Sequence, residues 1–278
     1  MQRLKMESEY VLFLEDSKFN YNYPLFDIQL AYDSKAFFAI KHEDQKYAVV
    51  KIYFAGHVRR FYVDNLVYGP DNCLAILANE VLLLCAEHNS GKLLKLSTNL
   101  EFLNDCVLTN CDVGNLEMIR SSPCKKFVFF YSKKQTAMFK YNPGSNVEIV
   151  KKDVALPSNV THMVVHEDLN HIAFNAFRKI YLVSFESGNI LSTFNNENVC
   201  YYGITFFKEC ILATTLDTLK VFYYGETNEK KKVKVHRKSQ REDEIQIKYP
   251  FCISNCSDFV LINFGSGSSY TTYKLSLL

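Results

Sequence analysis

The sequence lacks the short motifs that most directly indicate an enzyme. It contains no G-x-S-x-G elbow for a nucleophilic serine, no Walker-type phosphate loop and no G-x-G-x-x-G dinucleotide fingerprint. The stretch Gly265-Ser-Gly-Ser-Ser is better explained as a hairpin turn, because no helix follows it to offer its N-terminus to a phosphate. The acidic pairs Glu43-Asp44 and Glu167-Asp168 fall in polar turns between apolar runs. We therefore expect no catalytic residues.

An excess of charge of one sign is also missing. The chain has 32 basic and 30 acidic residues and a formal net charge of +2, so the total charge implies no polyanionic partner. The apolar run near the N-terminus is too short for a secretory signal and is surrounded by acids. The best membrane candidate, Cys73 to Ala86, is short and contains Asn79 and Glu80. We expect a nuclear or cytoplasmic protein with no membrane contact.

The nine cysteines do not form a recognisable metal or disulfide pattern. Three pairs have spacings that zinc ligands also use: Cys252 and Cys256, Cys106 and Cys111, and His162 and His166. No second Cys-x-x-Cys pair accompanies them, and residues four apart on a strand do not form a tight metal knuckle. We expect buried cysteines without disulfides, no metal site and no cofactor.

Short apolar runs separated by polar turns are what the sequence does contain. The clearest example extends from Asn159 to Phe194, where four runs rich in Val, Ile, Phe and Tyr alternate with turns such as HEDLN, NAFR and ESGN. These residues favour strands, and each run is too short for a stable helix. The stretch predicts a four-stranded antiparallel unit.

This unit recurs along the chain. Similar segments begin near residues 25, 66, 116, 160, 201 and 249, and propeller blades repeat about every 40–45 residues. We predict an all-β propeller that occupies residues 1–278 as one domain, with seven blades and six as the alternative. A β-sandwich or several small β domains is the competing architecture, but no Gly/Ser/Pro-rich linker divides the chain.

The last segment contains only three apparent strands. An open ring would leave sheet edges unpaired. We expect the N-terminal strand, Tyr10 to Leu14, to pair into this last blade and close the ring.

One charged segment, residues 226–249, interrupts the repeat as an insertion or a hairpin. Its basic residues are Lys230, Lys231, Lys232, Lys234, Arg237, Lys238 and Arg241. They could bind RNA phosphates with little sequence preference, or act as a nuclear-import signal. The alternative is a solvated loop that the following Glu242-Asp243-Glu244 neutralises.

The chain resembles a degenerate WD-repeat protein over nearly its whole length. It has no Trp, and the strands MFKY, YLVSF and KVFYY carry Phe or Tyr where the usual repeat carries a Trp-Asp pair. Its middle part resembles the non-catalytic WD-repeat subunits of tRNA (guanine-N7) methyltransferases in three stretches: NLEMIRSSPCKKFVFFYSKKQTAMFKYN, KKDVALPSNVTHMVV followed by NAFRKIYLV, and CILATTLDTLKVFYYG. The family's motifs are only partly kept, with an acid at Asp217 and the base at Lys220.

This resemblance implies a scaffold rather than an enzyme. The catalytic partner would bind S-adenosylmethionine and methylate tRNA, while this chain would form a heterodimer with it, hold it in its active conformation and contact tRNA through the basic segment. In that family the base that matches Lys220 lies at the subunit contact, with Asp217 beside it. Two alternatives remain: a generic interaction scaffold of another complex, and a propeller hydrolase with its site in the central channel.

Overall fold

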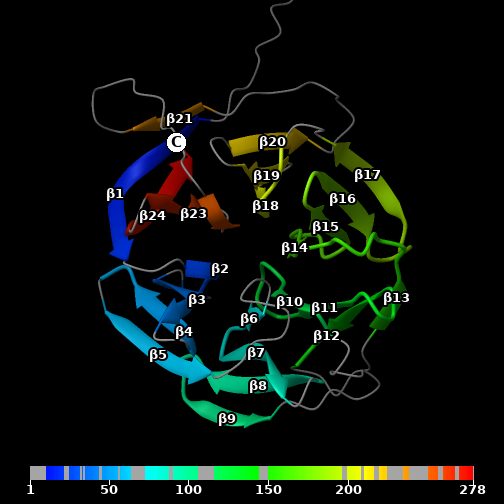
Figure 1. Cartoon of the computed structure of the whole chain (residues 1–278), viewed down its shortest axis with the longest axis horizontal. Helices are drawn as coiled ribbons and strands as arrows, with labels where there is room; N and C mark the ends of the chain where they lie inside the picture. Colours follow the sequence, from blue (N-terminus) through cyan, green and yellow to red (C-terminus); the bar gives the residue numbers. More distant parts are fainter. Residues whose placement is uncertain are drawn as a thin grey trace, which may run out of the picture.

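The apolar runs form strands along the whole chain, and these strands make a ring of sheets around a central axis in the computed structural model (Figure 1). The structure describes residues 11–21, 25–31, 33, 35–43, 46–55, 57–63, 73–87, 90–105, 116–143, 150–195, 199–207, 210–215, 219–223, 234–237, 250–255, 259–266 and 269–277, and for residues 11–21 and 234–277 only the backbone. No helix in this part of the chain is long and apolar enough to span a membrane.

Four sheets are four-stranded antiparallel blades whose strands follow the order of the sequence from the axis outward. They are blade 1, with β2 (Leu25–Leu30), β3 (Ala36–Glu43), β4 (Lys46–Tyr53) and β5 (Val58–Val63); blade 2, with β6 (Leu74–Ile76), β7 (Glu80–Glu87), β8 (Ser90–Ser97) and β9 (Phe102–Asp105); blade 3, with β10 (Met118–Ser121), β11 (Val128–Ser132), β12 (Ala137–Tyr141) and β13 (Val150–Asp153); and blade 4, with β14 (His162–Val165), β15 (His171–Ala176), β16 (Lys179–Ser184) and β17 (Ile190–Asn195).

Two further sheets complete the ring. Blade 5 has three described strands, and blade 6 has five in the order β21-β1-β24-β23-β22. Their bounds are β18 (Gly203–Phe207), β19 (Cys210–Thr214), β20 (Leu219–Tyr223), β21 (Lys234–Arg237), β1 (Val11–Tyr21), β24 (Ser269–Leu277), β23 (Phe259–Ser266) and β22 (Pro250–Asn255).

The predicted closure by the N-terminal strand is confirmed. Strand β1 pairs antiparallel with β24 of the last sheet, and β21 adds to its other edge in parallel. The inner strands β2, β6, β10, β14, β18 and β22 each contact the next, and β22 contacts β2. The expectation of seven blades is therefore wrong, because the inner strands of the six described sheets already close on one another and leave no place for a further sheet.

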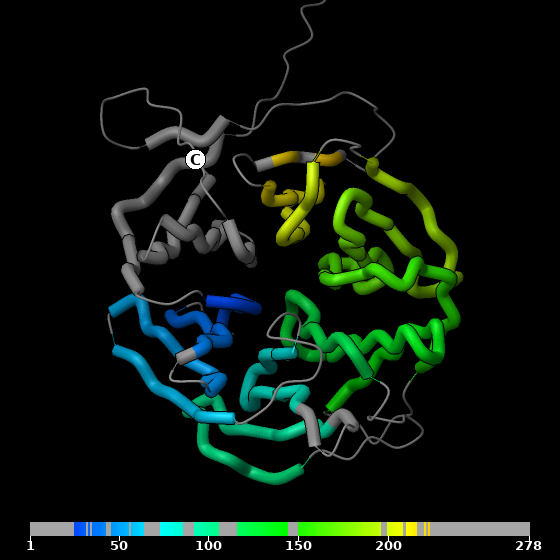
Figure 2. Tube along the Cα trace, in the orientation of Figure 1, coloured from blue at the N-terminus to red at the C-terminus, as the bar shows by residue number. Residues whose placement is uncertain are grey.

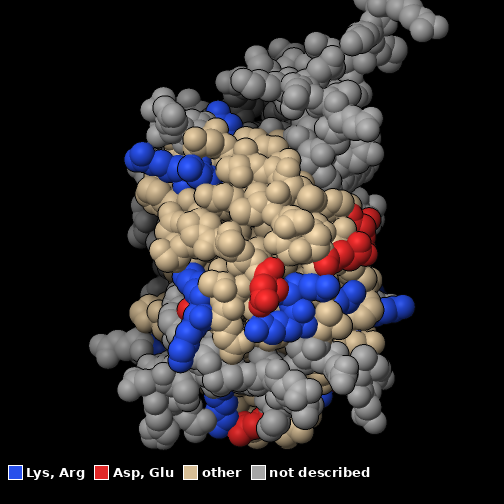
Figure 3. Space-filling model, turned by 90° about the vertical axis from the view of Figure 1, so that its right-hand side faces the viewer, with Lys and Arg blue, Asp and Glu red and all other residues tan. Residues whose placement is uncertain are grey.

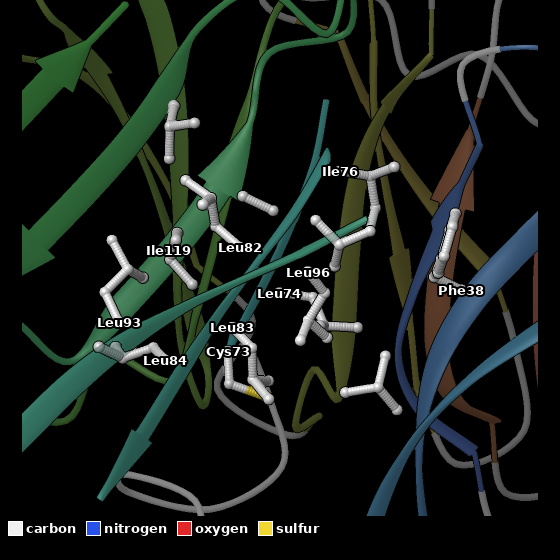
Figure 4. Packing of buried hydrophobic residues seen from close by; sticks show 14 of the residues in the cluster. Phe38, Cys73, Leu74, Ile76, Leu82, Leu83, Leu84, Leu93, Leu96 and Ile119 are labelled. Carbon is white, nitrogen blue, oxygen red and sulfur yellow. The ribbon is translucent and has the colours of Figure 1, made fainter. Parts of the chain in front are cut away.

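From blade 1 to blade 5, neighbouring blades are held together by apolar side chains on the faces of their sheets. One buried cluster joins blades 1, 2 and 3, with Phe38, Leu82 and Ile119 among its members (Figure 4). A second cluster joins blades 3 and 4, where the Tyr131 and Phe174 rings lie 5.1 Å apart. Because the middle strands are covered on both sides, their sequences are continuous apolar runs rather than alternating patterns. Figure 2 shows how the chain passes from blade to blade around the ring.

The cysteines with described side chains follow the sequence expectation in part. Cys73, Cys85 and Cys210 are buried and free, as expected for small apolar residues of a core. Cys200 is half-buried, and Cys124 is exposed in the β10–β11 turn.

The predicted turn at Glu186–Asn189 joins β16 to β17 and contains the one described glycine with a left-handed backbone. Gly188 has φ 72°, and a Cβ built on it would lie 2.2 Å from the carbonyl oxygen of Asp153 at the end of β13. The turn of blade 4 therefore packs directly on the outer strand of blade 3. Only glycine allows both the backbone angle and this close approach.

We expect Gly188→Ala to destabilise the protein by about 1–3 kcal/mol, since it adds strain at a positive φ and a clash with Asp153. Urea unfolding followed by circular dichroism measures the change. Glu186→Ala, an exposed substitution in the same turn, is the control and should change the free energy of unfolding by less than about 0.5 kcal/mol. Equal stability of the two variants would contradict this account of the turn.

Candidate functional site

The predicted partner-binding residue Lys220 lies on β20, the outermost described strand of blade 5, opposite Ala213 of β19. Its side chain is half-buried. Residues two apart on a strand share a face, so Lys220 is on the same face as Phe222. The Phe222 ring lies 5.6 Å from Tyr201 and 5.2 Å from Phe194 of β17. Lys220 therefore faces the boundary between blades 4 and 5.

The other predicted site residues are largely outside the described chain. Asp217, Lys230, Lys231, Lys232, Lys238 and Arg241 belong to the residues that the structure does not describe. Lys234 and Arg237 begin and end β21, for which only the backbone is described. The charged segment thus contributes at least one strand to the edge of the last sheet. The RNA-binding role of these residues stays a prediction.

The inner strands carry a buried polar network that links four blades. In β2 a bulge places Asp27 at φ 46° with its side chain fully buried. One Asp27 carboxylate oxygen accepts a hydrogen bond from the Leu74 backbone N of blade 2 at 2.7 Å, and the other pairs with the Arg120 guanidinium of blade 3. Arg120 also donates from Nε to the Met163 carbonyl of blade 4 at 3.1 Å. The guanidinium therefore ties together inner strands that are far apart in the sequence.

A second pair extends this network. Gln29 of β2 donates to the Leu74 carbonyl and accepts a hydrogen bond from the Ser121 hydroxyl of β10 at 3.0 Å. Both carboxylate oxygens of Asp27 are engaged, and its charged partner is a cation. A glycosidase would instead need two carboxylates facing each other across a substrate. In the described part of the axis these groups stabilise the ring, and the arrangement gives the hydrolase alternative no support.

Blade 3 contains an acid and a phenol with shifted pKa values. Burial raises the pKa of Glu117, although a hydrogen bond from the Lys133 backbone N at 3.0 Å and the Lys133 charge partly offset this. Burial and the nearby Glu117 charge raise the pKa of Tyr131 to about 12. Tyr131 lies on β11 in the apolar core, and Glu117 directly precedes β10, where its backbone N donates to the Tyr131 carbonyl at 3.0 Å. Their shifts follow from packing, and we assign them no chemistry.

The β15–β16 turn presents an aromatic side chain to solvent. Residues Phe177 and Arg178 form a two-residue hairpin between the paired Ala176 and Lys179. Phe177 has φ 62° and is 49% exposed, and the Arg178 guanidinium lies 5.8 Å from its ring centroid. Glycine is the usual residue at the first position of such a hairpin when φ is positive. A large aromatic residue there is strained and gains little from burial.

Hydrogen bonds to Tyr201, which lies just before the first strand of blade 5, fix the orientation of this turn. The Phe177 carbonyl accepts from the Tyr201 backbone N at 2.6 Å, and the Asn175 amide donates to the Tyr201 carbonyl at 2.8 Å. In an up-and-down blade, the turns between second and third strands lie on one face of the ring. Lys220, the second residue of β20, is near that same face. We call Phe177, Arg178, Lys179 and Lys220 the docking surface.

Phe177 was not selected from the sequence as a functional candidate, because the stretch NAFR separates two apolar runs as a turn and carries no catalytic signature. The available signal was the two-residue length of the turn, since that length favours a glycine or asparagine at positive φ and this sequence supplies an aromatic residue.

Lys and Arg side chains gather in a band on one side of the ring (Figure 3). Among the described residues, blade 3 has the largest excess of basic over acidic side chains. Its two acids are Glu117 and Asp153, and its eight basic residues are Arg120, Lys125, Lys126, Lys133, Lys134, Lys140, Lys151 and Lys152. Lys151 pairs with Asp153 at 3.5 Å, and both side chains are exposed. Salt bridges of this kind add little stability, so the local charge remains available to a partner.

The β14–β15 turn brings two imidazoles to one carboxylate. Asp168 Oδ2 lies 3.1 Å from His166 Nδ1 and forms a close pair with His171 Nδ1. Partial burial raises the pKa of Asp168, but hydrogen bonds from the backbone and side chain of His171 and from the Asn170 backbone outweigh it and lower the pKa to about 2. This cluster differs from the pair His162 and His166, whose spacing was considered and not taken as a metal site, because it uses residues of one turn.

The two cysteine pairs with zinc-like spacing, which the sequence did not favour as metal sites, fall largely outside the described side chains. Cys106, Cys111 and Cys256 lie outside the described residues, and Cys252 is on β22, where only the backbone is described.

No protein-family model matches the sequence, and no curated protein matches it. Solved structures of similar fold include a catalytically inactive virginiamycin B lyase from Staphylococcus aureus with quinupristin, at 14% identity and TM-score 0.55 over 94% of this chain and 98% of that chain. The Cps50 (Swd1) β-propeller domain of Myceliophthora thermophila is 11% identical, with TM-score 0.57 over 90% and 82%. TolB from Acinetobacter baumannii is 12% identical, with TM-score 0.52 over 91% and 54%. These likenesses establish the β-propeller fold alone.

We expect Arg120→Leu to cost about 3–5 kcal/mol, because it leaves the buried Asp27 carboxylate without its cation. The double variant Asp27→Asn/Arg120→Leu should recover part of this loss, since asparagine tolerates a positive φ and carries no charge. Urea unfolding of both variants measures the coupling. Lys151→Ala, which removes an exposed ion pair, is the control and should be within about 0.5 kcal/mol of wild type. A double variant no more stable than Arg120→Leu would refute the charge explanation.

Proposed function

We propose that this protein is a non-catalytic propeller scaffold that binds a protein partner through its docking surface. The main evidence for this proposal is that Phe177 is an exposed aromatic residue in a strained backbone conformation. A non-glycine residue in the left-handed region costs about 1–2 kcal/mol. Backbone strain of this kind indicates a functional role when side-chain packing does not offset its energy cost.

Three other residues with positive φ have a structural reason that Phe177 lacks. The Leu100 side chain is buried, and Leu169 packs against the apolar cluster between blades 3 and 4. Asp27 uses its conformation to reach Arg120. Phe177 instead projects its ring beside Arg178 at the ring surface. Aromatic and arginine side chains are the residues that most often anchor protein interfaces.

The partner that we propose is the catalytic subunit of a tRNA (guanine-N7) methyltransferase. The resemblance in the middle of the chain supports it, and the matching stretches map to blade 3, to the β15–β16 turn and to β19–β20. In this proposal Lys220 pairs with an acid of the partner, Asp217 lies beside it, and Phe177 fills an apolar pocket. The basic residues of blade 3 and of the 230–241 segment supply positive charge for tRNA. The protein would then act in the nucleus or cytoplasm.

A scaffold of another complex is the second candidate. The exposed apolar residues on the outer strands favour it, because they offer contact areas beyond the docking surface: Val58, Tyr62, Phe102, Leu103, Val150, Ile190 and Leu191. Affinity purification of the tagged full-length protein with mass spectrometry separates the two candidates. Recovery of a Rossmann-type methyltransferase supports the first. Reproducible recovery of an unrelated complex without it supports the second and refutes the first.

We expect Phe177→Gly to lower partner recovery at least about tenfold, because it removes the proposed anchor. Its free energy of unfolding should change by less than about 1 kcal/mol, since glycine relieves the strain at positive φ. Lys220→Glu should also reduce recovery through charge repulsion. Quantitative pull-down and urea unfolding are the two measurements.

The controls are matched in chemistry and placed on other blades. Phe102→Ser removes an exposed aromatic residue from β9 of blade 2, and Arg59→Glu reverses an exposed charge on β5 of blade 1. Both should bind like wild type. Undiminished recovery by folded Phe177→Gly and Lys220→Glu would show that the docking surface is wrong. Loss of N7-methylguanosine from tRNA on depletion of the protein tests the methyltransferase assignment itself.

A further inference from the structure

The turn from His166 to His171 holds three side chains with metal-ligating atoms. His166 Nδ1, Asp168 Oδ2 and a ligand atom of His171 all lie within 4.8 Å of one another. In a tetrahedral zinc site the donors are about 3.3 Å apart, since each is about 2.0–2.1 Å from the ion. The 3.1 Å separation of His166 Nδ1 and Asp168 Oδ2 is close to that value. The three side chains are 20–39% exposed, which leaves room for a water ligand.

Hydrogen bonds and a ring contact outside the proposed metal site orient its ligands. Asp168 Oδ1 accepts hydrogen bonds from the backbone N of Asn170 and of His171, both at 2.9 Å, which directs Oδ2 toward the two imidazoles. The His166 ring lies edge-on to Phe206 of β18, with centroids 5.0 Å apart. Such outer contacts hold ligands in place in metal sites. The Asp168 backbone N also donates to His166 Nδ1 at 3.3 Å, a long hydrogen bond that metal coordination through this nitrogen would replace.

Blade 3 shows that the turn itself does not require this set of residues. Its β10–β11 turn, Ser122 to Phe127, has the same backbone hydrogen bonds as the turn of blade 4, and Lys125 has the positive φ that Leu169 has there. In that turn Ser122 occupies the place of His166, and Phe127 the place of His171. The fold therefore accepts serine and phenylalanine where blade 4 has two histidines.

We propose that His166, Asp168 and His171 bind one divalent transition-metal ion, with Zn²⁺ as the ion that this donor set fits best. Two imidazoles and one carboxylate suit Zn²⁺ and related first-row ions, whereas Mg²⁺ and Ca²⁺ prefer oxygen donors. The three protein ligands leave coordination positions for water. All three ligands belong to one turn of blade 4, and the His166 ring contacts Phe206 of blade 5. This inference does not depend on the proposed scaffold function.

Metal-free full-length protein, prepared with a chelator, is titrated with Zn²⁺ by calorimetry. The variants copy blade 3: His166→Ser and His171→Phe. A third, Asp168→Asn, keeps an oxygen for the two backbone hydrogen bonds but removes the negative charge. His57→Gln, which removes an exposed histidine of blade 1, is the control. We expect each of the three variants to weaken the binding of one equivalent at least about tenfold, and the control to bind like wild type.

The visible spectrum of bound Co²⁺ shows whether the wild-type protein holds the ion through thiolates or through imidazole and carboxylate groups. Nine cysteines offer competing thiolate ligands, and a thiolate–cobalt charge-transfer band would reveal them. A visible Co²⁺ spectrum without that band, displaced by Zn²⁺ and absent from Asp168→Asn, supports the site. A thiolate band for the tightest equivalent, no binding by wild type, or equal binding by wild type and the folded variants would overturn the proposal.

Discussion

The apolar contact between neighbouring sheets is the constraint on which this structure depends. Blades 1 to 5, whose side chains are described, carry large apolar side chains on their faces, so none of them can bury its surface alone. Burial of one Phe or Leu contributes about 1.5–3 kcal/mol, and these contributions are available only when a next blade covers the face. The last blade must therefore meet the first. The pairing of β1 with β24 joins the two ends of the ring with backbone hydrogen bonds.

The same constraint explains how polar groups are distributed. Near the axis, Asp27 and Arg120 lose most of their contact with water, and they are tolerated because they satisfy each other and the backbone of blades 2 and 4. The turns at the two ends of the strands are exposed to water, so their polar groups do not need partners within the protein. Blade 4 uses that freedom twice, with the exposed Phe177 at one end and the His166–His171 cluster at the other. A rigid ring that carries variable turns is a suitable scaffold for binding sites.

The candidate site could be predicted only in part. Lys220 was selected through a family resemblance, and the structure places it at the boundary of blades 4 and 5. Phe177 was not selected, since its significance depends on a positive φ that composition does not reveal. His166 was considered with His162, four residues away, whereas its neighbours in space are Asp168 and His171. A reversal of the chain at Leu169 brings these side chains together, and strand spacing alone could not show it.

The strands, their grouping into repeated sheets and the use of the N-terminal strand for closure could be predicted from the sequence, because they follow from apolar runs and turn residues that act locally. The tertiary structure decided the number of sheets in the ring, the Asp27–Arg120 pair across blades and the contact of Gly188 with Asp153. Each of these joins residues distant along the chain, and their meeting depends on how sheets twist and pack. That geometry is a property of the closed ring, and no single segment of the sequence contains it.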